Sequence, residues 1–191
     1  MEREIYRADS KREDNLMKLI ETKLGGVYIV ELEPFADERG FYKRLWGKDE
    51  LADFGLDAEL NNVGLSSNKR RGTVRGMHYQ AAPFAETKIV QCVRGKVFDV
   101  VLDIRRDSET FGKWISVELS AENNRAIYIP KGLAHGFQTL ADDSEVLYFI
   151  SEKYDKESGR GVRWNDLQFG IKFPLAVSVI NERDANYADF E

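Results

Sequence analysis

KVFDVVLDIR (residues 96–105) and PKGLAHGF (residues 130–137) are the two stretches that decide the fold of this chain. The first follows a tight turn at Arg94-Gly95 and is rich in apolar and β-branched residues, which is typical of a strand. The second is a Pro-x-Gly turn that leads His135 into the start of another strand. Both stretches predict strands joined by short turns.

The same pattern extends outward along most of the chain. Apolar runs or alternation predict strands over residues 27–32, 40–45, 60–66, 88–93, 96–104, 114–119, 125–129, 136–140 and 145–154. A short helix is expected at 48–54, and the tail after Gly159 is expected to be loop. Many short strands with regular turns predict an all-β sandwich or closed barrel with few peripheral helices.

In the first 25 residues the apolar side chains recur at a different spacing. A capping box at Ser10–Glu13 precedes apolar residues at helical spacing, and Gly25-Gly26 supplies a stop signal. These features predict an amphipathic helix over 10–24. We therefore divide the chain into an N-terminal helical extension, 1–26, and a main domain, 27–191.

Composition limits the functions to consider. The chain has 191 residues and a net charge of −5, which argues against general nucleic-acid binding. No apolar run is long enough to span a membrane, and no signal-peptide pattern opens the sequence. The single cysteine, Cys92, lies in an apolar run and fits a reducing compartment. We expect a cytoplasmic protein without a membrane or nucleic-acid partner.

The chain has two histidines, His78 and His135. Histidine titrates nearest to neutral pH and is the usual proton carrier, although each could equally be a structural residue with satisfied hydrogen bonds. Two histidines cannot form a multi-histidine metal site unless carboxylates complete it. We expect no bound metal.

Further motifs follow one another in a recognisable order. They are DERGF (37–41), GTVRGMHYQ (72–80), DIR…TFGKW (103–114), LSAEN (119–123), RGVRWND (160–166) and ERDA (182–185). The two opening stretches look like the paired motifs of the cupin jelly roll, and residues 27–190 resemble the dTDP-4-dehydrorhamnose 3,5-epimerase family. The resemblance implies a jelly-roll isomerase that needs no cofactor. Its substrate would be a nucleotide-diphosphate 4-keto-6-deoxy sugar, inverted at the carbons that flank the ketone.

The resemblance also assigns catalytic roles. His78 would be the base, and Asp184 would orient and stabilise its imidazole. Lys88 would face the enolate oxygen, and Tyr148 would return a proton from the opposite face. Without the resemblance, these last three residues would be an ordinary tail carboxylate, an exposed lysine and a core aromatic.

Substrate-binding roles are implied in the same way. Arginine pairs bidentately with phosphate oxygens, so Arg39 and Arg75 would contact the diphosphate, with Arg163 a weaker candidate. His135 would position the sugar, and Tyr154 would stack on the nucleotide or line the pocket. Many cupins carry a second histidine where this chain has Gln80, which lies beside the base and is included among the site residues.

Family members form homodimers in which an early strand crosses to the partner, so Arg39 is expected to act in trans. Two positions depart from the family pattern. Arg44 replaces a glutamate and Gly64 replaces an asparagine, both near nucleotide or sugar contacts. These departures leave the identity of the nucleotide and sugar open.

Three other functions remain to be distinguished. The chain could invert carbon 3 alone, or it could be a 3,4-ketoisomerase on the same scaffold. It could also be a binding module for a nucleotide sugar without catalytic activity, although it retains His78.

Overall fold

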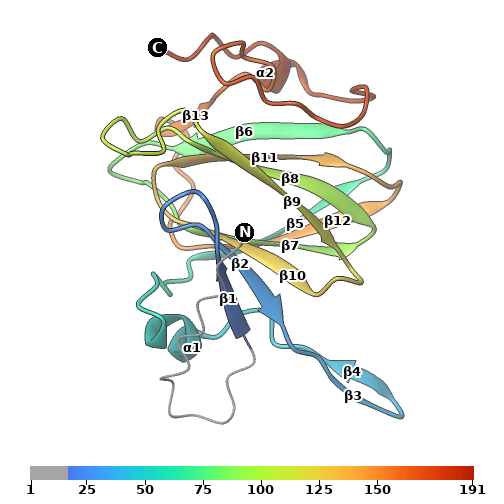
Figure 1. Ribbon diagram of the computed structural model, residues 1–191. Coiled ribbons are helices and arrows are strands. Elements are labelled where there is room, and N and C mark those ends of the chain that lie inside the picture. The colour runs from blue at the N-terminus through green and yellow to red at the C-terminus, as the bar shows by residue number, and fades with distance from the viewer. Residues whose placement is uncertain (1–16) are drawn as a thin grey trace.

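The computed structural model describes residues 17–191 and consists largely of two antiparallel β-sheets (Figure 1). The first sheet has the order β1-β2-β10-β7-β12-β5, formed by Met17–Glu21, Tyr28–Leu32, Arg125–Ile129, Lys88–Arg94, Ser144–Ile150 and Asn62–Asn68. The second has the order β13-β6-β11-β8-β9, formed by Gly159–Gly161, Val74–Gln80, Leu133–Thr139, Lys96–Asp103 and Trp114–Ser120. The prediction of an all-β fold is confirmed.

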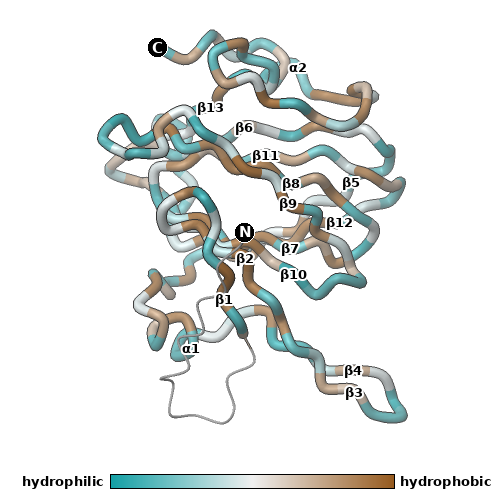
Figure 2. The backbone as a smooth tube through the Cα atoms, in the orientation of Figure 1, coloured by the Kyte–Doolittle hydropathy of each residue, from teal (hydrophilic) through white to brown (hydrophobic). Residues whose placement is uncertain are grey.

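The space between the sheets is filled by the inward side chains of both. Val90 and Cys92 of the first sheet and Val97, Val101 and Phe137 of the second belong to one buried cluster. Figure 2 shows hydrophobic residues along the strands and hydrophilic residues in many of the turns. The alternation noted in the sequence therefore corresponds to one face of each strand turned into a shared core.

Several small elements lie outside the two main sheets. The helix α1, Lys48–Asp53, confirms the short helix expected at 48–54, and its Leu51 packs against the outer face of the first sheet. The strands β3, Phe35–Asp37, and β4, Gly40–Tyr42, form a hairpin that projects from the body of the molecule (Figure 1). The tail after Gly159, expected to be loop, also contains β13 and a short helix α2, Glu182–Ala185.

The predicted helix over 10–24 is wrong from residue 17 onward. Met17–Glu21 is the strand β1, which pairs with β2 so that Met17 stands opposite Leu32. Met17 and Ile20 are both buried, and this spacing of three resembles the spacing on a helix face. Hydrogen bonding to an open sheet edge outweighs the weak local helix preference. Residues 10–16 of the predicted helix lie outside the described residues.

Pairing with β2 attaches residues 17–21 to the same sheet as the main domain. The division of the chain at residue 26 therefore does not mark a break in this sheet. Within residues 17–191, no helix has the length and apolar character needed to cross a membrane.

Candidate active site

A cavity of about 310 Å³ opens between the two sheets and collects most of the predicted site residues. Strands β6 and β11 of the second sheet contribute one wall, and β7 and β12 of the first contribute the other. The predicted residues that line it are Arg75, His78, Gln80, Lys88, His135, Tyr148 and Tyr154. The fold thus joins residues that are widely separated in the sequence.

A larger hollow of about 840 Å³ lies elsewhere, between the turns at 21–28 and 105–110. It contains none of the predicted site residues. Its Arg105 is already bound to Asp103 and to the backbone oxygen of Gly25. Chemistry rather than size therefore identifies the smaller cavity as the candidate active site.

His78 is paired with the buried Asp184, 106 positions later. Its Nε2 lies 2.8 Å from Oδ1 of Asp184, and the amide of Gly76 donates to Oδ2 at 3.0 Å. Asn181 caps α2 by accepting a 2.7 Å hydrogen bond from the backbone N–H of Asp184. These bonds fix the carboxylate directly against the imidazole.

The charge state of Asp184 determines which histidine nitrogen is free. Burial raises the pKa of Asp184. The hydrogen bond and charge interaction with His78 and the hydrogen bond from the Gly76 amide act in the opposite direction, and together they lower the pKa overall. The carboxylate is therefore ionised near neutral pH and accepts the proton of Nε2. Within residues 17–191, no hydrogen bond reaches Nδ1, so this nitrogen is available to take a proton.

Two neighbours of this pair were not predicted. Nη2 of Arg183 lies 3.2 Å from Nε2 of His78, and its Nε lies 3.4 Å from Oδ1 of Asp184. The ring of Tyr187 meets the ring of His78 edge-on at 6.2 Å. The ERDA motif contains Arg183, and its position next to Asp184 was the available signal.

His135 has a buried aspartate partner of its own. Its Nε2 lies 2.8 Å from Oδ2 of Asp99, a residue with no exposed surface. Oδ1 of Asp99 has no hydrogen-bond partner among the described residues. Asp99 was not predicted, although a lone carboxylate inside the apolar run 97–102 was a visible signal.

Tyr148 lies beside His135 on the opposite sheet. The two rings meet edge-on with centroids 6.1 Å apart. Burial raises the pKa of Tyr148 well above its ordinary value, and the charge of Asp99 raises it further. The phenol therefore keeps its proton at neutral pH and can donate it.

Lys88 carries the positive charge on the first-sheet wall. Its Nζ lies 2.9 Å from Oε1 of Glu86 and 3.5 Å from the backbone oxygen of His78. The side chains of Lys88 and Glu86 are each about one-tenth exposed. A largely desolvated ammonium group in this position can stabilise negative charge that develops on a bound substrate.

Three other predicted residues lie toward the rim or support it. Arg75 donates to Asn68 at 2.6 Å, and Tyr154 is largely exposed. The buried amide of Gln80 is occupied by the protein, because it donates to Phe84 and Lys153 and accepts from Asp155. Gln80 therefore orders the loops that border the cavity.

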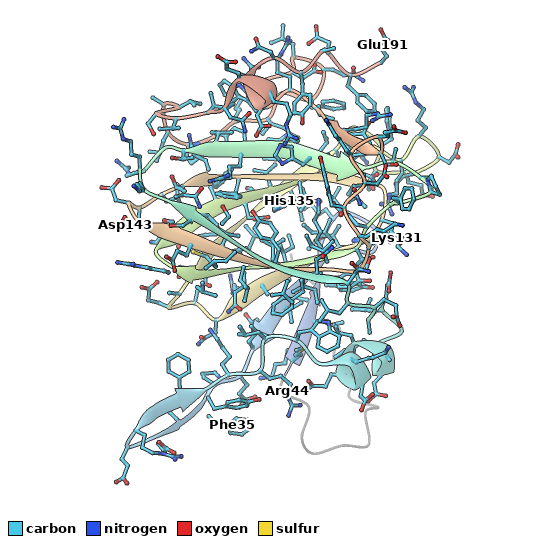
Figure 3. All side chains as sticks on the ribbon, turned by 180° about the vertical axis from the view of Figure 1, so that it is seen from behind. Phe35, Arg44, Lys131, His135, Asp143 and Glu191 are labelled. Atoms are coloured by element: carbon cyan, nitrogen blue, oxygen red, sulfur yellow. The ribbon has the colours of Figure 1, made fainter. Side chains whose placement is uncertain are left out.

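Arg39 and Arg163 do not line the cavity of this chain. Arg39 lies at the tip of the β3–β4 hairpin, where it is 84% exposed and pairs with Asp37. Arg163 pairs with Asp189. Figure 3 shows Phe35 at the base of the hairpin, well separated from His135 between the sheets.

The two departures from the family pattern lie in different surroundings. Arg44 pairs with Glu50 at 3.2 Å beside α1, away from His135 in Figure 3. Gly64 lies on β5 opposite Tyr148, and a Cβ there would meet no atom within 4 Å. Across residues 17–191, no group of three or more His, Cys, Asp or Glu side chains is placed to hold a metal ion.

One wall of the cavity carries the imidazole of His78, and the other carries the phenol of Tyr148 and the ammonium group of Lys88. These groups can remove a proton from one face of a carbon beside a carbonyl and return one to the other face, and the class of enzyme they define is the carbohydrate epimerases. A family model for dTDP-4-dehydrorhamnose 3,5-epimerase matches residues 21–191, and the chain belongs to this family.

Individual relatives agree with this assignment. A dTDP-4-dehydrorhamnose 3,5-epimerase of Shigella flexneri is 40% identical over 175 residues, which cover 91% of this chain and 96% of the relative. The crystal structure of the Bacillus anthracis enzyme with TDP and PPi bound matches with a TM-score of 0.88 and 36% identity, covering 91% and 99% of the two chains.

A third relative has a narrower activity. A 3'-monoepimerase from Streptomyces bikiniensis, solved with dTDP-quinovose, matches with a TM-score of 0.82 and 32% identity, covering 88% of this chain and 85% of that one. The predicted cupin-like jelly roll is confirmed by the structures of such relatives.

Proposed function

We propose that this epimerase inverts both C3 and C5 of dTDP-4-keto-6-deoxyglucose and needs no cofactor. One observation carries the proposal. His78 comes from β6 of the second sheet and Tyr148 from β12 of the first, so base and acid face one cavity from opposite sheets. Inversion at carbon requires a proton acceptor and a proton donor on opposite faces of the ring, and this arrangement supplies them.

His78 removes the proton from the substrate. The C4 ketone acidifies the C–H bonds at C3 and C5, and the free Nδ1 of His78 accepts the proton. The imidazolium that forms is stabilised by the ionised Asp184 at 2.8 Å. A positioned base of this kind contributes a rate factor of about 10² to 10⁴.

Negative charge then moves onto the oxygen at C4. Lys88 is the ammonium group available on the wall opposite His78, and it is desolvated enough for a strong interaction. A charged donor aimed at an enolate oxygen lowers the barrier by a rate factor of about 10² to 10³.

Reprotonation completes the inversion. Tyr148 keeps its proton because burial raises its pKa, and it delivers this proton to the face opposite His78. Exchange with solvent afterwards returns the phenol and the imidazole to their starting states. The same cycle serves each carbon in turn.

The nucleotide diphosphate extends toward the rim. Arg75 lies there with its guanidinium held by Asn68 and Ser67, and it is suited to pair with phosphate oxygens. Tyr154 offers an exposed aromatic face for the base. We assign sugar positioning to His135, whose tautomer is set by Asp99.

We propose a homodimer as the working form. The β3–β4 hairpin exposes Phe35, Phe41 and Tyr42 and carries Arg39 at its tip, outside the cavity of its own chain. A projecting apolar hairpin is typical of an interaction surface. In a homodimer it would deliver Arg39 to the partner's diphosphate. We place the enzyme in the cytoplasm, in keeping with its single free cysteine.

Inversion at C3 alone is the second candidate, favoured by the likeness to the 3'-monoepimerase. The two are separated by incubating the protein with dTDP-4-keto-6-deoxyglucose, reducing with borohydride and identifying the sugars. L-Rhamnose supports inversion at both carbons. 6-Deoxyallose without L-rhamnose supports inversion at C3 alone. Sugars of unchanged configuration at C3 and C5 would contradict both, and a 3-keto product seen by NMR before the reduction would reveal a ketoisomerase.

A further inference from the structure

Glu86 is an acidic side chain inside the cavity that the mechanism above does not use. It lines the same cavity as His78 and Tyr148, and it is only 11% exposed. Its Oε1 lies 2.9 Å from Nζ of Lys88. A carboxylate this close to Lys88 weakens the interaction of the ammonium group with an enolate oxygen, so the position of Glu86 needs another explanation.

The backbone holds Glu86 in this position. Glu86 lies two residues before the start of β7 at Lys88, and both side chains line the cavity whereas Thr87 does not. Thr87 donates its N–H to Ser151 at 2.9 Å and its hydroxyl to Asp57 at 3.1 Å, and its carbonyl accepts from the Ser151 N–H at 3.0 Å. The Glu86–Lys88 pair is therefore fixed as a unit on the cavity wall.

Each member of this pair retains hydrogen-bonding capacity. The ammonium of Lys88 has three N–H groups, and its partners in the protein are Glu86 and the carbonyl of His78. Among the described residues no hydrogen bond reaches Oε2 of Glu86. The pair thus presents one donor and, next to it, one charged acceptor.

A donor beside an acceptor matches a ketone beside a hydroxyl. On a 4-keto-6-deoxyhexose, C3 carries a hydroxyl, whereas C5 carries a methyl group. H3 and H5 of this sugar lie on the same face of the ring, so with O4 on Lys88 a swing of the ring within its own plane brings either C3 or C5 to the base without changing the face presented. Glu86, which lies to one side of Lys88, then contacts the 3-hydroxyl in one pose and loses this contact in the other.

We propose that Glu86 recognises the substrate by accepting a hydrogen bond from its 3-hydroxyl, and so stabilises the pose in which C3 is deprotonated. This inference rests on the proposed function and adds a specificity residue to it. One base serves two carbons, so the two poses compete, and Glu86 sets the balance between them.

The test is proton NMR of dTDP-4-keto-6-deoxyglucose in deuterium oxide with wild type, Glu86→Gln and Glu86→Asp. The variants remove the charge or withdraw the carboxylate. Glu152→Gln is the matched control, because Glu152 also lines the cavity, whereas the ion pair recorded for Lys88 among the described residues is with Glu86. Charged hydrogen bonds are about twice as strong as neutral ones, so we expect deuterium entry at C3 to fall about 10-fold or more in Glu86→Gln. Entry at C5 should change less than about 3-fold.

The readout distinguishes failure of the inference from failure of the proposed function. If wild type incorporates no deuterium at either carbon, the proposed function is wrong. If wild type exchanges protons at both carbons and both Glu86 variants keep its ratio of deuterium entry at C3 to entry at C5, Glu86 does not recognise the 3-hydroxyl. If wild type exchanges C3 alone, an unchanged C3 rate in folded Glu86 variants overturns the inference. A thermal melt of each variant establishes that it is folded, and Glu86→Asp serves if Glu86→Gln does not fold.

Discussion

His78 and His135, the two histidines of the chain, stand directly opposite one another on the antiparallel strands β6 and β11. Each has its Nε2 2.8 Å from a fully buried aspartate, Asp184 for His78 and Asp99 for His135. The surroundings of the two pairs differ. His78 is one-third exposed to the cavity, whereas His135 is buried and packs edge-on against Tyr148. This difference is the basis for making His78 the base and His135 a positioning residue.

Replacing Tyr148 with phenylalanine should separate proton removal from inversion. The base is untouched, so Tyr148→Phe should still exchange ring protons with solvent. Product of inverted configuration should fall about 10² to 10³-fold, because the donor on the opposite face is lost. Deuterium exchange and borohydride trapping in the same sample measure the two steps. Undiminished inversion in Tyr148→Phe would remove this residue from the mechanism.

Arg75→Ala should weaken substrate binding more than chemistry. Its guanidinium is proposed to pair with the diphosphate, an interaction made equally in the ground and transition states. We expect KM to rise about 10 to 100-fold while kcat changes less than about 3-fold. Arg125→Ala is the control, since Arg125 pairs with Glu31 away from the cavity. A fall in kcat at unchanged KM would argue against a diphosphate contact.

The hairpin should control the oligomeric state. Phe41 is 66% exposed on β4, and a charge there would oppose burial in a subunit interface. Phe41→Glu should shift the mass measured by sedimentation equilibrium from dimer to monomer, with a rise in KM from loss of Arg39 in trans. A wild-type protein that sediments as a monomer at micromolar concentration would contradict the proposed dimer.

Acid should destabilise the protein through Asp103. Burial raises the pKa of Asp103, but hydrogen bonds from Arg105, Ser108 and Thr110 outweigh burial and hold it well below the ordinary 3.8. The folded state therefore binds this proton less readily than the unfolded state. The resulting stabilisation is complete above the unfolded pKa and is lost as pH falls from about 4 toward the lowered value.

Asp103→Asn tests this linkage. We expect the free energy of unfolding to fall by about 2 to 4 kcal/mol at pH 7, because three donors lose a charged acceptor. Urea denaturation at pH 7 and pH 3 should show a smaller difference between variant and wild type at the lower pH. Asp107→Asn, at an exposed neighbouring site, should change little. An equal loss at both pH values would rule out the charge of Asp103 as the cause.

Local patterns were sufficient to predict most strands and the short helix at 48–54, because alternation and turn residues act over a few positions. They failed at Met17–Glu21, where two buried residues three apart suit a helix face as well as an edge strand. The choice there depends on the exposed edge of β2, which lies outside the local sequence.

The candidate site, like the fold, was predicted only in part from the sequence. His78 and Asp184 are 106 positions apart in the sequence, and only the fold brings them together. Their pairing was therefore predicted from family motifs and not from local patterns. Asp99 and Glu86 lay outside those motif assignments and were missed. Both had a physical signal, since Asp99 interrupts an apolar strand and Glu86 precedes Lys88 by two positions, the repeat of an extended chain.

The most direct test of the account is proton NMR of dTDP-4-keto-6-deoxyglucose in deuterium oxide with wild type and His78→Asn. We predict that wild type incorporates deuterium at both C3 and C5. His78→Asn, folded by thermal melt, should lose about 10² to 10⁴-fold of the rate at both carbons, since one base serves both. Exchange in His78→Asn at the wild-type rate would contradict the assignment of His78 as the base, and no exchange in folded wild type would contradict the epimerase mechanism itself.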